Sequence, residues 1–240
     1  MYTAINAIGE IIGINNAIRG REYFCAACGS RLIMKCGDVV QHHFAHESSY
    51  VCDPWYSDNK GPWHRAIQSL FADHAQEYVI RSDDDPDRYH IADVCLRRSG
   101  KANIIFEFQQ SPISKSEFEE RSDFYIHNGR NIVNGKPINN IMYWIFFYAD
   151  KNTIYERYRS AERKECVYSE GRRQYQWDHR CKQFEDLDFK NTDNPTVIFD
   201  LGDNFYIRVD YAFDGCRFFG GKTVKKSDFI QWAIHTGKNR

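Results

Sequence analysis

The sequence lacks the features that direct a chain into a membrane or out of the cell. Its longest apolar run, residues 141–149, is far shorter than the roughly 20 residues that a transmembrane helix needs. The first residues have neither the basic region nor the apolar stretch of a signal peptide. We therefore expect a cytoplasmic protein with no membrane partner.

A large charge of one sign is also missing, because the formal net charge is -1. Such a chain has no overall field that attracts nucleic acid, so any DNA-binding surface must be a local patch. The sequence also contains no internal repeat and no low-complexity segment. Its hydrophobic share of 42% is sufficient for a packed core, which argues against wholesale disorder.

The eight cysteines of a protein expected in the cytoplasm predict thiols and metal ligands, not a disulfide framework. Cys25 and Cys28 form a C-x-x-C pair that is followed by Gly29, and an H-x-x-H pair comes after a gap that fits a hairpin. Two thiolates and two imidazoles make a closed tetrahedral set that suits structural Zn²⁺. The predicted ligands are Cys25, Cys28, His43 and His46, with His42 and Cys52 as substitutes for either histidine.

Apolar periodicity divides the chain into three expected domains. These are an N-terminal segment with the zinc module (1–53), a core (54–150) and a C-terminal, β-rich extension (151–240). The core is expected to be of mixed α+β and α/β class, in the order helix, strand, strand, strand, helix, strand. The predicted elements are a helix from Pro62, strands near 78–81, 89–97 and 103–109, a helix capped by Ser114 and Glu117, and a buried strand at 141–148.

Two predicted strands carry acidic side chains that stand out from their apolar surroundings. Asp93 lies on one strand, and Glu107 and Gln109 lie on the next, where residues two apart share a face. If the two strands pair as a hairpin, Asp93 can lie near Glu107. An ionised Glu107 between two phenylalanines is costly without a cation. Two such carboxylates are hard oxygen ligands for Mg²⁺ or Mn²⁺, as hydrolysis of a phosphodiester requires.

These motifs together resemble the competence protein CoiA-like family, whose members are predicted PD-(D/E)XK nucleases with an N-terminal zinc finger. The resemblance covers roughly residues 23–150. It is carried by Cys25, Cys28, residues 42–46, Cys52, His64, residues 92–94, residues 107–109, Ser111, Ile113, Arg121, Tyr125, Trp144 and Ile145. It implies a restriction-endonuclease-like core of the form αβββαβ.

The resemblance also implies roles for individual residues. Asp93 and Glu107 would hold Mg²⁺ or Mn²⁺, and Gln109 would replace the lysine of the usual D…E-x-K motif. His64 would face the site from the first helix, and Ser111 and Arg121 would support it or contact a phosphate. The chain departs from the family pattern in the first helix, where an acidic residue commonly precedes the histidine and a lysine follows it by four. Pro62 and Gln68 occupy those places.

Each supporting residue also has a purely structural interpretation. His64 equally fits a partly buried helix histidine. Arg121 fits an ion pair with Glu117 or Glu120 on its own helix. Tyr125 fits a core position better than a catalytic one, and Ser111 fits a turn before a proline.

The stretch 151–182 contains nine Lys or Arg and five Asp or Glu, interleaved with tyrosines and Trp177. Basic side chains follow phosphates and aromatic rings stack on bases, so the stretch is a candidate nucleic-acid track. A solvated surface rich in salt bridges is an equal alternative. Residues 197–209, interrupted at 202–204, predict a hairpin.

Three functional hypotheses follow. The first is a metal-dependent DNA nuclease, hydrolysing phosphodiester bonds in DNA processing, recombination or antiviral defence against foreign DNA. The second is a catalytically weak or inactive nuclease-fold module that binds DNA and recruits a partner. The third is a structural adaptor that docks a protein through its zinc module. Assembly with a partner protein or as a homo-oligomer is compatible with each, because the charge-balanced monomer offers little general affinity for DNA.

Overall fold

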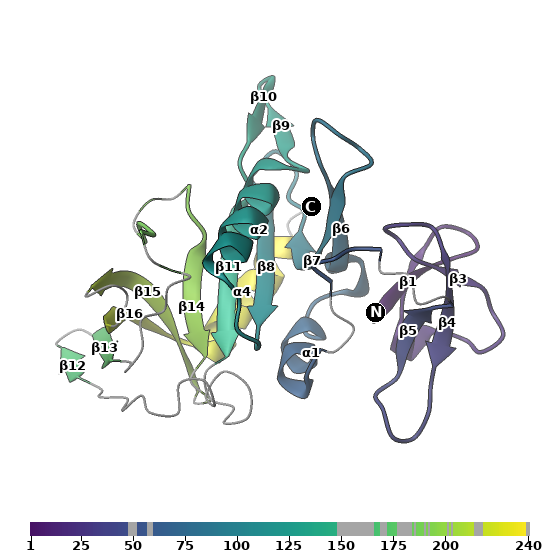
Figure 1. Ribbon diagram of the computed structural model, residues 1–240, viewed down its shortest axis with the longest axis horizontal. Helices are drawn as coiled ribbons and strands as arrows, with labels where there is room; N and C mark the ends of the chain where they lie inside the picture. Colours follow the sequence, from purple (N-terminus) through teal and green to yellow (C-terminus); the bar gives the residue numbers. More distant parts are fainter. Residues whose placement is uncertain are drawn as a thin grey trace. The chain divides into compact units, whose positions relative to one another are not determined.

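The computed structural model has two compact units, Met1–Cys95 and Leu96–Arg240 (Figure 1). The residues that it describes are 1–47, 52–56, 60–147, 166–168, 172–176, 184, 186–189, 191, 193–200, 202, 204–213 and 218–238. Most of the predicted basic, aromatic stretch at 151–182 therefore lies outside the described residues. Among the helices of the described residues, none has the length and apolarity needed to cross a membrane.

The first unit begins with a small antiparallel sheet in the strand order β2-β1-β3-β4-β5. Its strands are β1 (Thr3–Asn6), β2 (Ile11–Gly13), β3 (Tyr23–Phe24), β4 (Arg31–Lys35) and β5 (His43–His46), with a 3-10 turn η1 (Ile14–Asn16). The hairpin expected between the two metal-ligand pairs is present as β4–β5, and β1 and β2 form a further hairpin. Tyr23, Leu32 and Phe44 pack in a small core between the strands.

The first unit continues with α1 (Pro62–Gln68), the 3-10 turn η2 (Asp73–Ala75), β6 (Gln76–Arg81) and β7 (Tyr89–Leu96). Helix α1 starts at Pro62, as expected of a residue whose missing N–H is not needed in the first turn. It ends at Gln68. Strands β6 and β7 pair antiparallel, and β7 ends at the boundary between the two units.

The second unit is a mixed sheet with helices. Its elements are β8 (Ile104–Gln109), α2 (Lys115–His127), β9 (Asn131–Val133), β10 (Lys136–Ile138), β11 (Ile141–Phe147), β12 (Cys166–Tyr168), β13 (Arg172–Gln176), β14 (Thr196–Asp200), β15 (Phe205–Phe213), β16 (Phe218–Lys225) and α4 (Lys226–Lys238). The strand order is β12-β13-β16-β15-β14-β11-β8. Strand β11 runs parallel to both β8 and β14, and the other pairs are antiparallel. The predicted hairpin at 197–209 is confirmed as β14–β15.

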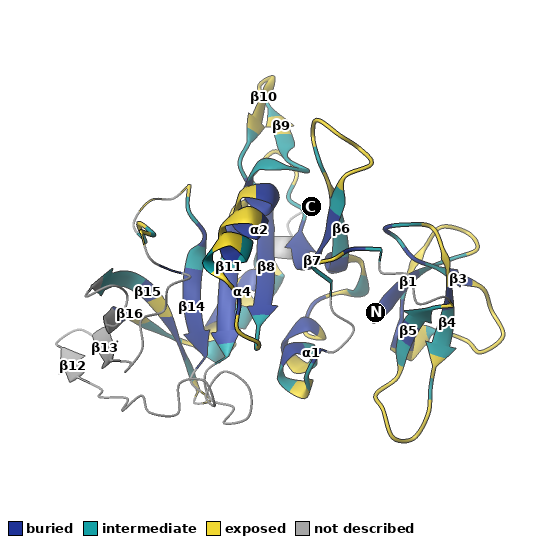
Figure 2. Ribbon diagram, in the orientation of Figure 1, coloured by how far each residue is buried: buried dark blue, intermediate teal, exposed yellow. Residues whose placement is uncertain are grey.

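The two faces of this sheet are covered by different helices. On one face Phe118 of α2 packs against Trp144 of β11, with ring centroids 5.3 Å apart. On the other face Phe229 of α4 packs against Phe106 of β8 and Tyr206 of β15. Figure 2 shows β8, β11 and β14 as buried strands, which explains their nearly continuous apolar sequences.

The element order α1, β6, β7, β8, α2, β11 agrees with the expected order αβββαβ, with the hairpin β9–β10 inserted before the last strand. Ser114 caps α2 as predicted, because its Oγ accepts a hydrogen bond from the backbone N–H of Glu117 at 3.1 Å. The structure is thus a mixed α/β fold with an N-terminal sheet and a larger mixed sheet. The assignment to the PD-(D/E)XK class remains a prediction.

Candidate functional site

Three cysteines and one histidine gather at one end of the N-terminal sheet. Ligand atoms of Cys25, Cys28, His46 and Cys52 all lie within 4.8 Å of one another. The Sγ atoms of Cys25 and Cys52 are 3.9 Å apart, and Sγ of Cys28 lies 3.4 Å from Nε2 of His46.

These separations fit a tetrahedral zinc site. With Zn–S near 2.3 Å and Zn–N near 2.1 Å, a tetrahedron has S···S edges of about 3.8 Å and S···N edges of about 3.6 Å. All four positions are filled by protein ligands, so the site is closed and suits a structural ion. In the metal-free chain, the side-chain hydrogen bond from Cys52 lowers the pKa of the Cys25 thiol to about 5. The same contact raises the pKa of Cys52.

The local backbone explains which residues reach this cluster. Gly29, with φ of 71°, closes a tight turn and donates its N–H to the carbonyl of Cys25 at 2.9 Å. On β5, residues two apart share a face, so His46 lies on the same face as the fully buried Phe44. His43 is three residues from His46 and therefore points the other way.

The predicted ligand set needs one correction. His43 lies outside the cluster, with its Nδ1 2.9 Å from the carbonyl oxygen of Gln41. His42 is not among the clustered residues either. The fourth position belongs to Cys52, which the sequence suggested only as a substitute. The H-x-x-H motif is not a ligand pair here, because the two-residue period of a strand places its two histidines on opposite faces.

Asp93 lies at the centre of a second cluster, within the first unit. Its Oδ1 atom is 2.7 Å from Nζ of Lys60 and 3.0 Å from Nε2 of His64. Gln68 donates to the backbone carbonyl of Asp93 at 3.0 Å. Burial by itself would raise the pKa of Asp93, but the charges and hydrogen bonds of His64 and Lys60 hold it below its usual range. Burial lowers the pKa of His64.

Glu77 lies on the other side of Lys60 and is fully buried, with its Oε1 3.7 Å from the ammonium. Its carboxylate accepts hydrogen bonds from the N–H groups of Tyr2 and Thr3, from the Thr3 hydroxyl and from the Tyr56 hydroxyl. Burial favours the neutral form of Glu77, but Lys60 and these donors hold its pKa below the usual value. Glu77 thus links β6 to strand β1 of the N-terminal sheet. This sheet (β1–β5) and its cysteine-histidine cluster are called the metal module below.

Lys60 and Glu77 were both missed in the sequence. Glu77 stands beside an apolar strand segment, as Glu107 does, and the same reasoning about a costly buried charge could have found it. Nothing in the sequence around Lys60 indicates that its side chain is buried.

In the second unit, Glu107 is 1% exposed on β8 and faces α2, where it pairs with the guanidinium of Arg121. Arg121 also lies 3.4 Å from Glu117 on its own helix, as one structural interpretation expects. The guanidinium lies over the ring of Trp144, 5.0 Å from its centroid. Phe106 faces the α4 side, so the predicted alternation of faces along β8 is confirmed.

The remaining predicted site residues lie at the end of β8 and in the core. Gln109 follows Glu107 by two and donates to the carbonyl oxygen of Ser111 at 2.6 Å. Ser111 is exposed, and Tyr125 is a fully buried core residue. Within the described part of the chain, the cysteine-histidine cluster is the one group of three or more side chains that could hold a metal. Asp93 and Glu107 belong to different units.

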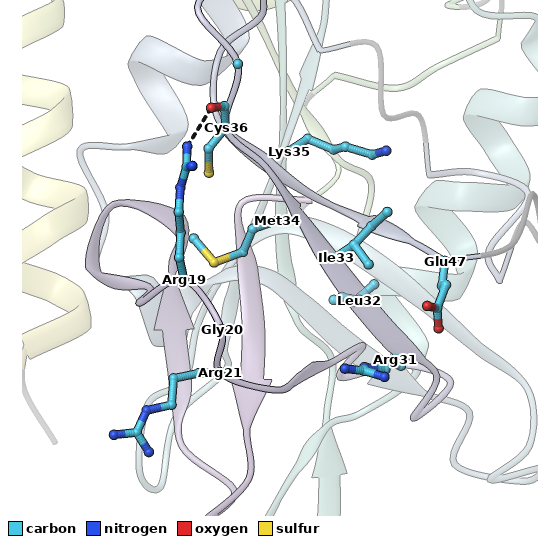
Figure 3. A pocket seen from close by; sticks show the side chains of 11 residues that line it. Arg19, Gly20, Arg21, Arg31, Leu32, Ile33, Met34, Lys35, Cys36 and Glu47 are labelled. Atoms are coloured by element: carbon cyan, nitrogen blue, oxygen red, sulfur yellow. Dashed lines mark hydrogen bonds between the residues drawn. The ribbon is translucent and has the colours of Figure 1, made fainter.

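A hollow of about 540 Å³ lies on the surface of the metal module (Figure 3). Four of its lining residues are basic, namely Arg19, Arg21, Arg31 and Lys35, and Glu47 is acidic. Arg19 donates to the carbonyl oxygen of Cys36 at 2.9 Å, which fixes it along one wall. Arg31, Ile33 and Lys35 alternate along β4 with the core residues Leu32 and Met34. This is a local basic surface on a chain without net positive charge.

The N-terminal sheet and its cluster of three cysteines and one histidine thus form a small module that could hold zinc. Residues 14–54 match the family model described as competence protein CoiA, N-terminal domain. All four clustered ligands lie within that segment, and the predicted resemblance is confirmed there. Comparison with curated proteins and with solved structures gave no match.

Proposed function

We propose that this protein is a divalent-metal-dependent nuclease that hydrolyses phosphodiester bonds of DNA. Three features support the proposal: the element order αβββαβ, the buried carboxylates Asp93 and Glu107 on consecutive strands, and the CoiA N-terminal domain at 14–54. The name of that family, a competence protein, agrees with a role in DNA processing or recombination. Defence against foreign DNA would use the same chemistry.

The burial of the Glu107 carboxylate is the observation on which the proposal rests. It is buried in an apolar strand where a neutral or apolar side chain would fold at lower cost, and an ionised carboxylate there needs a cation. Arg121 supplies that positive charge in the metal-free chain. A carboxylate placed at such a cost is typical of a functional site.

In the proposed reaction Asp93 and Glu107 each supply a hard oxygen ligand to Mg²⁺ or Mn²⁺. The donor chemistry fits, because Mg²⁺ is commonly held by one or two carboxylates together with waters and substrate phosphates. When bound, such an ion would supply Lewis-acid chemistry that activates the phosphodiester and the attacking water. Gln109 orients the attacking water, and His64, Ser111 and Arg121 orient or contact the phosphate. The zinc module is structural.

The second candidate is a binding module that keeps the fold without turnover. One observation favours it: Asp93 and Glu107 already have protein cations, Lys60 and Arg121, within ion-pair distance. A divalent ion must displace these contacts to reach the carboxylates. In this candidate the protein binds DNA and recruits a partner protein or a second copy of itself.

The proposed nuclease is tested by cleavage of single- and double-stranded DNA with Mg²⁺ or Mn²⁺. Asp93→Asn and Glu107→Gln should abolish cleavage. Asp200→Asn is the matched control, because Asp200 is an equally buried carboxylate whose partner Lys226 lies 2.6 Å away. It should reduce the free energy of unfolding but not cleavage. Binding of DNA without cleavage by the parent protein would favour the binding module instead.

The basic hollow on the metal module is the candidate surface for the DNA backbone. Arg19, Arg21, Arg31 and Lys35 provide guanidinium and ammonium donors that fit phosphate oxygens. Since the net charge is -1, binding must rest on such a local surface.

A further inference from the structure

The connection between β4 and β5 presents two adjacent apolar side chains to solvent. Val39 is 97% exposed and Val40 is 58% exposed, and the two residues are called the apolar tip below. The rest of the connection, from Gly37 to His42, is exposed as well, and Figure 2 shows it as a loop that extends beyond the two strands. Apolar side chains exposed singly are common on protein surfaces, whereas those that lie together are typical of a contact surface.

Hydrogen bonds hold both ends of this connection to other parts of the first unit. Arg19 donates from its guanidinium to the carbonyl oxygen of Cys36 at 2.9 Å. Arg65 of α1 donates to Oε1 of Gln41 at 2.8 Å, and its guanidinium lies over the ring of Tyr2. The chain is thus fastened before and after the apolar tip, and the tip itself is left in solvent.

The basic hollow adjoins the apolar tip. Cys36 and Gly37, the first residues of the connection, both line it. Figure 3 shows Arg19 and Lys35 at this end of the hollow, close to Cys36. One acidic side chain, that of Glu47, also lines it. Donors that fit phosphate oxygens and an apolar projection therefore lie next to each other on one surface.

We propose that the apolar tip is a wedge that contacts the open face of a base pair where duplex DNA ends or is interrupted. This inference rests on the proposed action on DNA. The basic hollow holds the phosphates beside the wedge and fixes its position. Asp38, which is exposed next to the tip, accepts a hydrogen bond from the amino group of an unpaired cytosine.

The size of the tip decides which DNA it fits. Apolar side chains that enter a base step must offset the cost of unstacking it. That cost is smallest where the bases are already unpaired. Two valines bury too little surface to open a continuous duplex, but they can cover a base pair that has lost one neighbour. The junction between double- and single-stranded DNA meets this condition.

Charge favours DNA over a protein as the occupant. The formal net charge of the chain is -1, yet four basic residues line the hollow beside the tip. Such a concentration of positive charge attracts a polyanion. A continuous duplex supplies phosphates without an open base-pair face, and a single strand supplies phosphates without a base pair. The wedge therefore predicts tighter binding to a fork than to either.

The test measures binding of the full chain to a duplex, a single strand and a fork with two unpaired arms, without added Mg²⁺ or Mn²⁺. Fluorescence anisotropy gives the affinities, and 2-aminopurine at the fork reports unstacking. Val39→Ser with Val40→Ser removes the tip. Leu70→Ser with Ile132→Ser is the matched control, because these side chains are 50% and 65% exposed outside the metal module. Thermal unfolding is measured for each protein.

The parent protein should bind the fork about tenfold more tightly than the duplex, since partial burial of two valine side chains supplies a factor of that order. The fluorescence of 2-aminopurine should rise on binding. The tip variant should lose both effects and still bind the duplex as the parent does, because the hollow is unchanged. The control variant should keep both.

Equal affinity of the parent for fork and duplex would overturn the wedge, as would an unchanged preference for the fork in the tip variant. A parent that sediments as a dimer, with a monomeric tip variant, would make the valines an interface between copies and would also overturn it. Fork preference without any cleavage would reject the nuclease and leave the wedge. Cleavage without fork preference would do the reverse. A parent that binds none of the three DNAs would overturn both.

Discussion

Sγ of Cys28 lies 3.4 Å from Nε2 of His46, although the two residues are 18 positions apart in the chain. Cys28 stands in the tight turn before β4, and His46 ends β5. An ion held by both residues would therefore fix the β4–β5 hairpin against that turn. Cys52 extends the same link to β7, because its carbonyl oxygen accepts a hydrogen bond from the hydroxyl of Tyr89.

The ligand assignment predicts opposite results for two substitutions. Cys52→Ser should lose the bound zinc, because it removes one of four ligands from a closed site. His43→Ala should retain it, since His43 lies outside the cluster. Zinc content per chain and thermal unfolding with and without a chelator measure the difference. Retention of zinc by Cys52→Ser, together with its loss from His43→Ala, would restore the ligand set predicted from sequence.

Glu77 should make the stability of the protein depend on acidic pH. Its pKa is lowered in the folded chain, so its contribution is fully present above the unfolded value near 4.3. That contribution is lost as pH falls from there through the folded pKa. Glu77→Gln should cost about 3 kcal/mol of unfolding free energy at pH 7, because Lys60 and the backbone donors lose their charged partner.

The measurement is urea unfolding between pH 7 and pH 3. The difference in unfolding free energy between the parent and Glu77→Gln should shrink as the pH falls below about 4. A difference that stays constant over this range would show that the carboxylate charge of Glu77 contributes little.

The sequence predicted the helices and strands well where local signals were strong. Pro62 and Ser114 mark the starts of α1 and α2, and residues 141–147 form a buried strand as their apolar, aromatic composition predicts. The elements expected from the sequence do not include the hairpin β9–β10, although Asn134-Gly135 is the usual signal for a tight two-residue turn. Both residues have positive φ, as that turn requires.

The candidate sites were harder to predict because their members meet through tertiary contacts. Asp93 and Glu107 could be found, since an acidic residue in an apolar strand is conspicuous. Lys60 could not, because its burial depends on where the chain before α1 runs. The H-x-x-H spacing favours His43 over Cys52 only if the two-residue period of a strand, which places His43 and His46 on opposite faces, is ignored.

The pair of Glu107 and Arg121 should behave as a coupled unit. Arg121→Met leaves a buried carboxylate without its cation and should cost about 3–5 kcal/mol of unfolding free energy. Adding Glu107→Gln to that variant should recover part of this loss, because the uncompensated charge is gone. Chemical unfolding of the parent, both single variants and the double variant gives the coupling energy. Additive losses would mean that the two side chains do not interact strongly in solution.

The basic hollow on the metal module predicts how DNA binding responds to salt. Replacing Arg21 and Arg31 by glutamate should weaken DNA binding and reduce the slope of log affinity against log salt by about 1 for each lost phosphate contact. Lys101→Glu with Lys136→Glu is the matched control, since both lysines are exposed outside the module and the net charge changes equally.

Fluorescence anisotropy with a labelled oligonucleotide at several salt concentrations distinguishes local contact from overall charge. If the hollow binds the backbone, the module variant loses slope and the control keeps it. Equal losses in both double variants would mean that total charge, not the hollow, governs binding. An unchanged slope in the module variant would place the DNA contacts elsewhere on the chain, and the hollow would then have no part in substrate binding.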